Sequence, residues 1–204
     1  YTLLFNGFSF RGEYRLIEEI KKLNGVEDCY RAAEYKLPED AKPDGNPTKL
    51  STSVGFINAD DMWALGYTGQ GQTIAVIDTG IKVNHTNFAT APQDPHFDAA
   101  GIQSVLNRYD LCAEERYNGT LTGATLYHSA KLPFTFNYYA GNTDVSHANA
   151  GSDHGTHVSS IAAGCDSSSR GVAYNAQIIS MQVFQDGGAA WSEILAALED
   201  CAWL

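Results

Sequence analysis

The stretch QTIAVIDTG, residues 72–80, constrains the fold more than any other part of the 204-residue sequence. Its four consecutive apolar residues, Ile74–Ile77, lack polar alternation, which is typical of a strand buried on both faces of a parallel sheet. The run ends abruptly at Asp78. A carboxylate in this position lies at the carboxyl edge of the sheet, where open α/β sheets form their active sites.

After this strand, a helix, a second strand and a second helix are predicted in this order along the chain. THVSSIAAG predicts a helix of small residues, AQIISMQVF a second buried strand, and SEILAALEDCAWL a helix with one apolar side. This order predicts an α/β fold built on a parallel sheet with right-handed crossovers. Residues 85–150, which have no strong periodicity, are interpreted as long loops with minor structure.

The first 38 residues predict a separate strand–helix–strand unit. Residues 1–12 alternate loosely, the next thirteen have helical spacing, and residues 26–37 are interpreted as a second strand. Such a unit is too small to form a core of its own. Residues 39–53 are rich in Pro, Gly, Asn and Ser and are interpreted as a linker.

Charge and composition exclude several classes of protein. The formal net charge is −11; residues 1–50 hold eight Lys or Arg and nine Asp or Glu, so the acidity belongs to the rest of the chain. A nucleic-acid partner is not expected, because phosphate binding needs a basic face. The four cysteines lack C-x-x-C spacing, which argues against a zinc knuckle. No apolar run reaches the ~18–20 residues that cross a bilayer, so no membrane span is expected.

AGSDHGTHVSSIAAG holds two histidines three residues apart, His154 and His157. Zinc-binding pairs on a helix are usually spaced i, i+4 with a glutamate between them. Here the spacing is i, i+3, and the intervening residues are Gly and Thr. We therefore predict no metal site, and we interpret His157 as a packing histidine that hydrogen-bonds locally.

The other role open to His154 is that of a general base. An imidazole held by a carboxylate is the base half of a Ser–His–Asp system, and Asp78 at a strand end offers such a carboxylate. A turn or capping residue before Gly80 is the alternative interpretation of Asp78. Gly155 removes a side chain beside His154, so the helix can pack close to the sheet.

The two motifs together resemble those of a known family. AVIDTG and HGTHVSSIAAG resemble the Asp and His motifs of subtilisin-like serine peptidases. The resemblance implies a parallel-sheet α/β catalytic domain in which Asp78 orients His154 and His154 acts as the general base. His157 matches the second, non-catalytic histidine of the motif.

The similarity continues in GVAYNAQIISMQVFQDGGAAWSEI. In the family, this segment leads into an edge that pairs with the substrate backbone, so the resemblance implies that Gly187 and Gly188 line the non-primed cleft. Trp191 then matches the aromatic floor of a distal pocket. Small residues would let an extended peptide add to this edge by β-augmentation. An ordinary turn before a helix is the alternative interpretation of the two glycines.

The resemblance also divides the chain. Residues 1–38 resemble the C-terminal half of the family's inhibitory propeptide, an α+β ferredoxin-like domain. Residues 39–53 are then the linker, and residues 54–204 the N-terminal part of the peptidase domain. The long spacing of 76 positions between Asp78 and His154, together with LPFTFNYYAGNTDVSH, resembles that of the large cell-envelope proteinases of the lactocepin type.

Two departures from the family are plain. The nucleophile motif G-T-S-x-x-x-P does not occur in the sequence, so we expect an N-terminal piece of a longer enzyme that is inactive alone. A calcium-ligating aspartate of compact members falls near Asn87, so no calcium site is supported here and no cofactor is expected.

We therefore expect a serine endopeptidase with an Asp–His–Ser triad, secreted or attached to the cell envelope, whose partners are protein substrates and its own propeptide. The alternative is a non-catalytic pseudopeptidase or a propeptide-type module that binds a peptidase. A nucleotide-binding domain is disfavoured, because DTGIKVNH is not the glycine-rich phosphate loop G-x-G-x-x-G.

Overall fold

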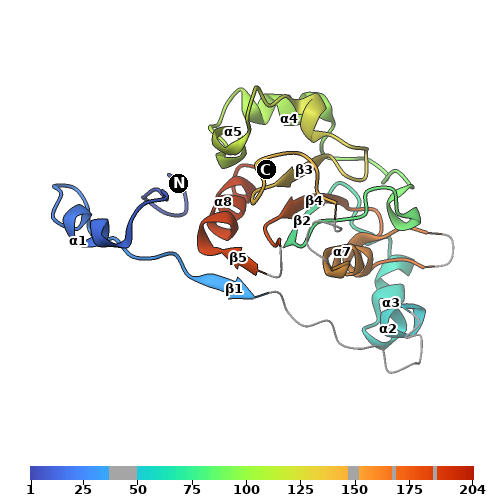
Figure 1. The fold of residues 1–204 in the computed structure, drawn as a ribbon. Coiled ribbons are helices and arrows are strands. Elements are labelled where there is room, and N and C mark those ends of the chain that lie inside the picture. The colour runs from blue at the N-terminus through green and yellow to red at the C-terminus, as the bar shows by residue number, and fades with distance from the viewer. Residues whose placement is uncertain (37–49, 147–151, 167–168, 186–187) are drawn as a thin grey trace.

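A three-stranded parallel sheet forms the centre of the molecule (Figure 1). The computed structural model describes residues 1–36, 50–146, 152–166, 169–185 and 188–204. The strands, in spatial order, are β2 (Thr73–Asp78), β4 (Gln177–Gln182) and β3 (Phe134–Asn137). Asp78 and Asn137 both lie in register with Gln182, so the three carboxyl ends meet at one edge of the sheet. The expected α/β fold with a parallel sheet is confirmed.

The two apolar strands differ in burial, although the sequence predicts the same for both. Every residue of β4 is buried, as expected for a central strand. In contrast, β2 is only half-buried and its Ala75 is exposed. The prediction of burial on both faces is therefore wrong for β2, because within the described residues β2 lies at the edge of the sheet.

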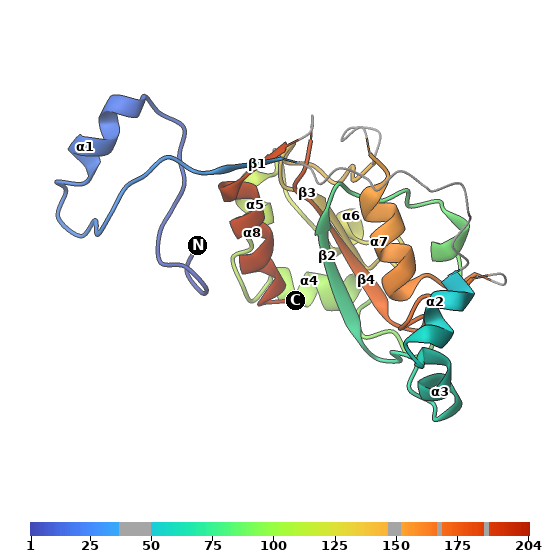
Figure 2. The same ribbon diagram turned by 90° about the horizontal axis from the view of Figure 1, so that it is seen from below.

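Helices cover both faces of the sheet. Figure 2 shows α7 (His154–Ala163) and α8 (Trp191–Cys201) on opposite sides of β2 and β4. Consecutive residues of β4 accordingly enter different cores. Ile178 packs in the cluster that contains Ala163 of α7, whereas Ile179 packs in the cluster that contains Ala196 and Ala197 of α8. This alternation follows from the two-residue period of a strand.

Residues 85–145 contain more structure than the long loops that the sequence predicts. They form η2 (Thr86–Phe88), α4 (Ala99–Leu106), α5 (Cys112–Arg116) and α6 (Gly123–Leu126) before β3. Helices this short gain their stability from tertiary packing rather than from propensity. Their apolar side chains, such as Ile102, Leu111 and Leu126, are fully buried in the core that includes α8. Local periodicity could not reveal them for this reason.

A buried carboxylate joins α5 to α8. Asp200 of α8 has no exposed surface. Its carboxylate accepts hydrogen bonds from the first two amides of α5, at Cys112 (2.7 Å) and Ala113 (3.0 Å), and from the Tyr138 hydroxyl (2.8 Å). Burial raises the pKa of Asp200 to about 6, even though these hydrogen bonds act to lower it. The charged form is therefore disfavoured in the folded protein relative to the unfolded chain.

This shift predicts a pH-dependent contribution to stability. The folded-state pKa of Asp200 lies above the ~3.9 of an unfolded aspartate, so its contribution is complete below about pH 4 and is lost as the pH rises through 6. The loss amounts to about 3 kcal/mol. In urea titrations, the unfolding free energy of wild type minus that of Asp200→Asn is expected to fall by about 2 kcal/mol between pH 4 and 7. A difference that rises with pH would contradict the assignment.

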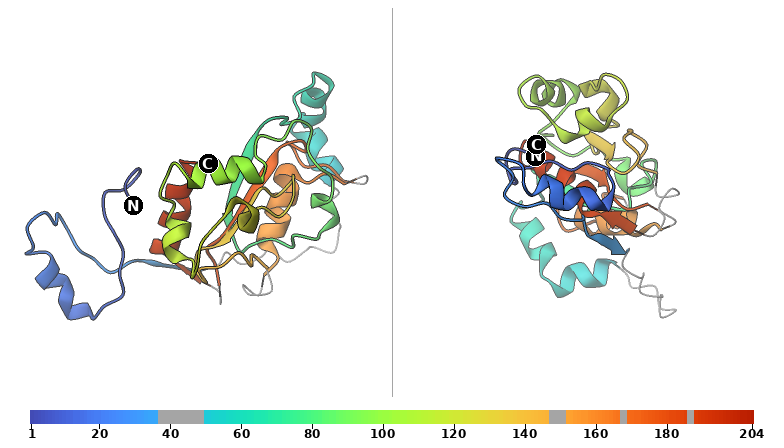
Figure 3. Two further views of the ribbon diagram at one scale, coloured as in Figure 1. Left: turned by 90° about the horizontal axis from the view of Figure 1, so that it is seen from above. Right: turned by 60° about the vertical axis from the view of Figure 1, so that its left-hand side comes forward.

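Much of the N-terminal segment, residues 1–36, projects from this body, while its two ends contact α8 and β5 (Figure 3). It contains η1 (Tyr14–Leu16), α1 (Ile17–Ile20) and β1 (Glu34–Lys36), and none of its residues is buried. The described part of the segment thus contains no buried side chain that could form a core. The strand predicted in residues 1–12 is not formed, and the predicted helix is limited to residues 14–20.

Short helices precede β2, and a short strand precedes α8. They are α2 (Leu50–Phe56), α3 (Ala59–Ala64) and β5 (Gly188–Ala190). Residues 39–49 of the predicted linker lie outside the described residues, and residues 50–53 fall within α2. In the part of the chain that the structure describes, no helix is both long and apolar enough to cross a membrane.

Candidate active site

Asp78 and His154 meet at the carboxyl edge of the sheet. Asp78 is the last residue of β2, and His154 is the first of α7. The His154 Nδ1 atom lies 2.9 Å from both Asp78 carboxylate oxygens. A ring nitrogen between two carboxylate oxygens carries the proton, so Nε2 of the neutral imidazole is left as a proton acceptor. The fold thus brings together two residues that are 76 positions apart in the chain.

Backbone and hydroxyl contacts hold this pair in place. The Asp78 carboxylate accepts from the Thr79 amide at 2.7 Å, and the Gly155 amide donates to the Thr79 hydroxyl oxygen at 2.9 Å. The Thr156 hydroxyl oxygen accepts from the Lys82 amide at 2.9 Å. These bonds tie the first turn of α7 to the end of β2. Sequence reasoning missed both threonines, although each stands inside a motif, DTG or HGTH.

Gly155 permits the close contact between α7 and the sheet, as its position predicts. A Cβ at Gly155 would lie 2.2 Å from the carbonyl oxygen of Gly80 and 3.2 Å from the Asp78 Cβ. Real Cβ atoms do not approach a backbone oxygen so closely. Gly80 has a φ of +92°, a conformation that glycine adopts without strain. Both glycines are therefore required by the geometry that brings His154 to Asp78.

His157 differs from its prediction. Its side chain is exposed on α7 and does not pack in a core. Its neighbours at i−1 and i+2, Thr156 and Ser159, are buried, so the helix turns His157 away from the sheet. Among the described residues, no group of three or more His, Cys, Asp or Glu side chains is arranged to hold a metal ion.

The predicted substrate edge carries an extended segment of this same chain. Strand β5 pairs antiparallel with β1, with Gly188 opposite Lys36 and Ala189 opposite Tyr35. The pairing extends to Trp191, whose amide donates to the Ala33 carbonyl at 2.8 Å.

Side chains at this edge are close to the paired segment. A Cβ at Gly188 would lie 3.1 Å from the Tyr35 carbonyl oxygen, so a small residue is favoured there. The Trp191 and Tyr35 rings are 5.9 Å apart. Gly187, the other predicted cleft residue, lies outside the described residues.

A further contact with the N-terminal segment was not predicted. The Glu199 carboxylate of α8 accepts from the amides of Thr2, Leu3 and Leu4, the last at 2.8 Å. Its side chain is almost fully buried. The only signal in the sequence is the acidic pair Glu199–Asp200 within a helix that otherwise has a clear apolar side.

Comparison with known proteins identifies the family of this chain. The model of the subtilase family matches residues 69–202, which include Asp78, His154 and the β5 edge. The chain belongs to the subtilase family. The match begins shortly before β2, so the N-terminal segment lies outside it.

Individual relatives of this subtilase match nearly the whole chain. It is 28% identical to a PII-type proteinase of Lacticaseibacillus paracasei over 99% of this chain and 10% of the relative. It is 26% identical to the minor extracellular protease Vpr of Bacillus subtilis over 98% of this chain and 22% of the relative. The chain thus spans less than a quarter of the length of these curated relatives. The resemblance to cell-envelope proteinases of the lactocepin type is confirmed by the first match.

Proposed function

We propose that this subtilase is a serine endopeptidase of protein substrates, in which Asp78 orients the imidazole and His154 is the general base. The supporting observation is the 2.9 Å contact of His154 Nδ1 with both Asp78 oxygens. In this mechanism, Nε2 accepts the proton of a serine hydroxyl while the serine oxygen attacks the scissile carbonyl carbon. Asp78 stabilises the imidazolium, which then protonates the leaving amine.

The serine and the oxyanion-hole asparagine belong to a part of the enzyme outside these 204 residues. In support, no G-T-S-x-x-x-P motif occurs within it, and the relatives extend far beyond the matched part. A base without a nucleophile and without donors for the oxyanion cannot transfer an acyl group. Residues 1–204 alone are therefore expected to be inactive.

The substrate binds as an extended strand along β5, with Gly187 and Gly188 next to its backbone and Trp191 next to a distal side chain. In support, β1 pairs with this edge in the same manner. Residues 1–38 accordingly act as the C-terminal half of an inhibitory propeptide, and Glu199 clamps their first amides. Residues 39–53 link this segment to the peptidase domain, whose N-terminal part is residues 54–204.

The proposed location is extracellular, in solution or at the cell envelope. In support, one relative is named a minor extracellular protease. The proposed proton transfers need only side chains of the triad, so no cofactor is invoked for the reaction.

A serine-directed fluorophosphonate tests this function in the full-length protein. We expect one label, on a serine outside residues 1–204, because only a serine next to His154 is activated as a nucleophile. Labelling is expected to be slower while residues 1–36 remain bound at β5. Mass spectrometry locates the label. A protein that takes up no label and cleaves no extended peptide would instead be a pseudopeptidase or a peptidase-binding module.

A further inference from the structure

Strand β5 depends on its two ends for its position. It is only three residues long, and among the described residues its one strand partner is β1. When a substrate replaces β1, no strand of the main sheet, within the described residues, pairs with β5. Its C-terminal end continues directly into α8 at Trp191. The position of the peptide-binding edge is therefore set in large part by the first turn of α8.

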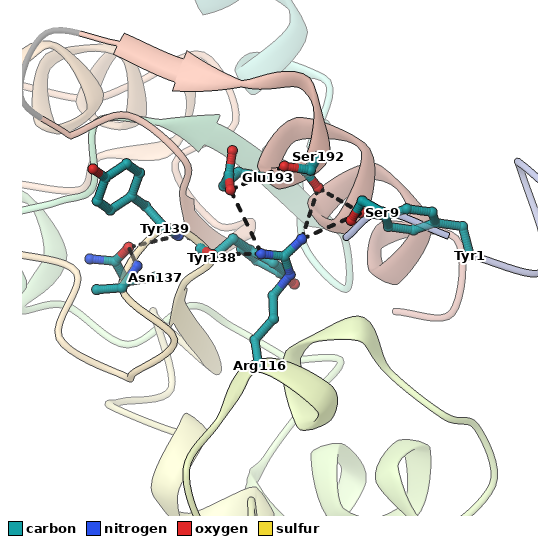
Figure 4. Close-up of polar contacts among 9 residues, drawn as sticks. Tyr1, Ser9, Arg116, Asn137, Tyr138, Tyr139, Ser192 and Glu193 are labelled. Carbon is teal, nitrogen blue, oxygen red and sulfur yellow. Dashed lines mark hydrogen bonds and ion pairs between the residues drawn. The ribbon is translucent and has the colours of Figure 1, made fainter. Parts of the chain in front are cut away.

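A single arginine fastens that first turn. Figure 4 shows the Arg116 guanidinium, which α5 supplies, inserted between the start of α8 and the residue that follows β3. Its Nη2 donates to the Ser192 carbonyl at 3.1 Å, and its Nη1 donates to the Tyr138 carbonyl at 3.1 Å. The same Nη1 lies 3.8 Å from a carboxylate oxygen of Glu193. The planar guanidinium of Arg116 thus connects the start of α8, at Ser192 and Glu193, to Tyr138 after β3.

The surroundings make this connection hard to replace. The Glu193 side chain is only 9% exposed, and its Oε2 atom has no hydrogen-bond partner among the described residues. Tyr138 is fully buried, and its hydroxyl is held by Asp200. The anchor on the β3 side is consequently rigid, so Arg116 transmits a fixed position to the start of α8.

The N-terminal segment meets the same guanidinium. The Tyr1 hydroxyl donates to the Ser192 carbonyl at 3.1 Å and lies 3.4 Å from Arg116 Nη2 (Figure 4). The start of α8, which Arg116 holds, therefore also contacts the N-terminal segment.

We propose that Arg116 is a positioning residue for the peptide-binding edge, through which residues 85–145 control the recognition of extended substrates. This inference rests on the proposed peptidase function. Arg116 acts on β5 through Ser192 and Glu193. Its loss is expected to weaken the binding of long peptides far more than that of substrates too short to reach β5.

The test uses Arg116→Gln in the full-length protein, with Arg108→Gln as the matched control. Arg108 is exposed, and its guanidinium lies over the Tyr109 ring. Like Arg116, it belongs to the part of the sequence between Asp78 and His154. We expect Arg116→Gln to lower kcat/KM for a long peptide about ten-fold more than for a single-residue ester, with the loss carried by KM. Arg116→Lys, which keeps the charge and loses the fork, is expected to fall between wild type and Arg116→Gln. Arg108→Gln is expected to behave as wild type.

Two further measurements separate positioning from misfolding and from inactivity. Arg116→Gln leaves Glu193 buried without its cation, so Arg116→Gln/Glu193→Gln is expected to recover stability but not the long-peptide KM. Hydrogen exchange at the Trp191 amide is expected to be about ten-fold faster in Arg116→Gln, whether or not the protein is a peptidase. Unchanged exchange at Trp191, or equal losses for long and short substrates, would overturn the inference. Absence of hydrolysis in wild type would instead overturn the proposed function.

Discussion

Replacing His154 by alanine in the full-length protein is expected to lower kcat by about 10⁴-fold or more, with a much smaller change in KM. Losses of this order or larger follow the removal of one member of such a triad. The reason is that Nε2, which Asp78 leaves free to accept a proton, is lost, while the β5 edge is untouched. Steady-state hydrolysis of an extended peptide measures both constants, and fluorophosphonate labelling is expected to stop.

His157 provides a matched control for this experiment. It lies on the same helix, one turn further along, and its side chain is exposed. His157→Ala is expected to keep kcat within about two-fold of wild type, since substitutions of exposed side chains outside functional contacts have small effects. Equal losses in the two variants would mean that damage to α7, and not the loss of a base, explains the result. Full activity of His154→Ala would refute the assignment of the base.

Replacing Gly155 by alanine is expected to destabilise the protein by about 1–3 kcal/mol and to lower activity as well. The added Cβ would lie 2.2 Å from the Gly80 carbonyl oxygen, which belongs to the backbone and cannot rotate aside. Relief requires α7 to move away from β2, and this movement separates His154 from Asp78. Urea unfolding gives the change in stability, and peptide hydrolysis gives the change in rate.

Gly101→Ala is the control for this substitution. Gly101 also lies within a helix, α4, but the nearest atoms to its added Cβ are side-chain atoms at 3.4 Å. Since alanine favours the helix, this variant is expected to be neutral or more stable by about 0.5–1 kcal/mol. A Gly155→Ala protein as stable and active as wild type would show that the close approach of α7 is not required.

The candidate site was largely predictable because its information is local. Asp78 ends an apolar run, His154 precedes a helix of small residues, and Gly155 stands where the two elements meet. Each of these features is a property of a few consecutive residues. The residues that support the site were not predictable in this way. Glu199 and Arg116 act through contacts with segments distant in sequence, and nothing in their immediate neighbours indicates which partner they meet.

The amino-acid sequence alone predicts the α/β class, the strand ends that carry the candidate residues and the family resemblance. These follow from the residue periods of strands and helices and from short motifs, each of which spans only a few consecutive residues. Tertiary contacts instead leave β2 at the edge of the sheet within the described residues, allow residues 85–145 to form helices, and place β1 on β5. Burial, strand order and the stability of short helices are set by the partners that pack against each element, and those partners are distant in the chain.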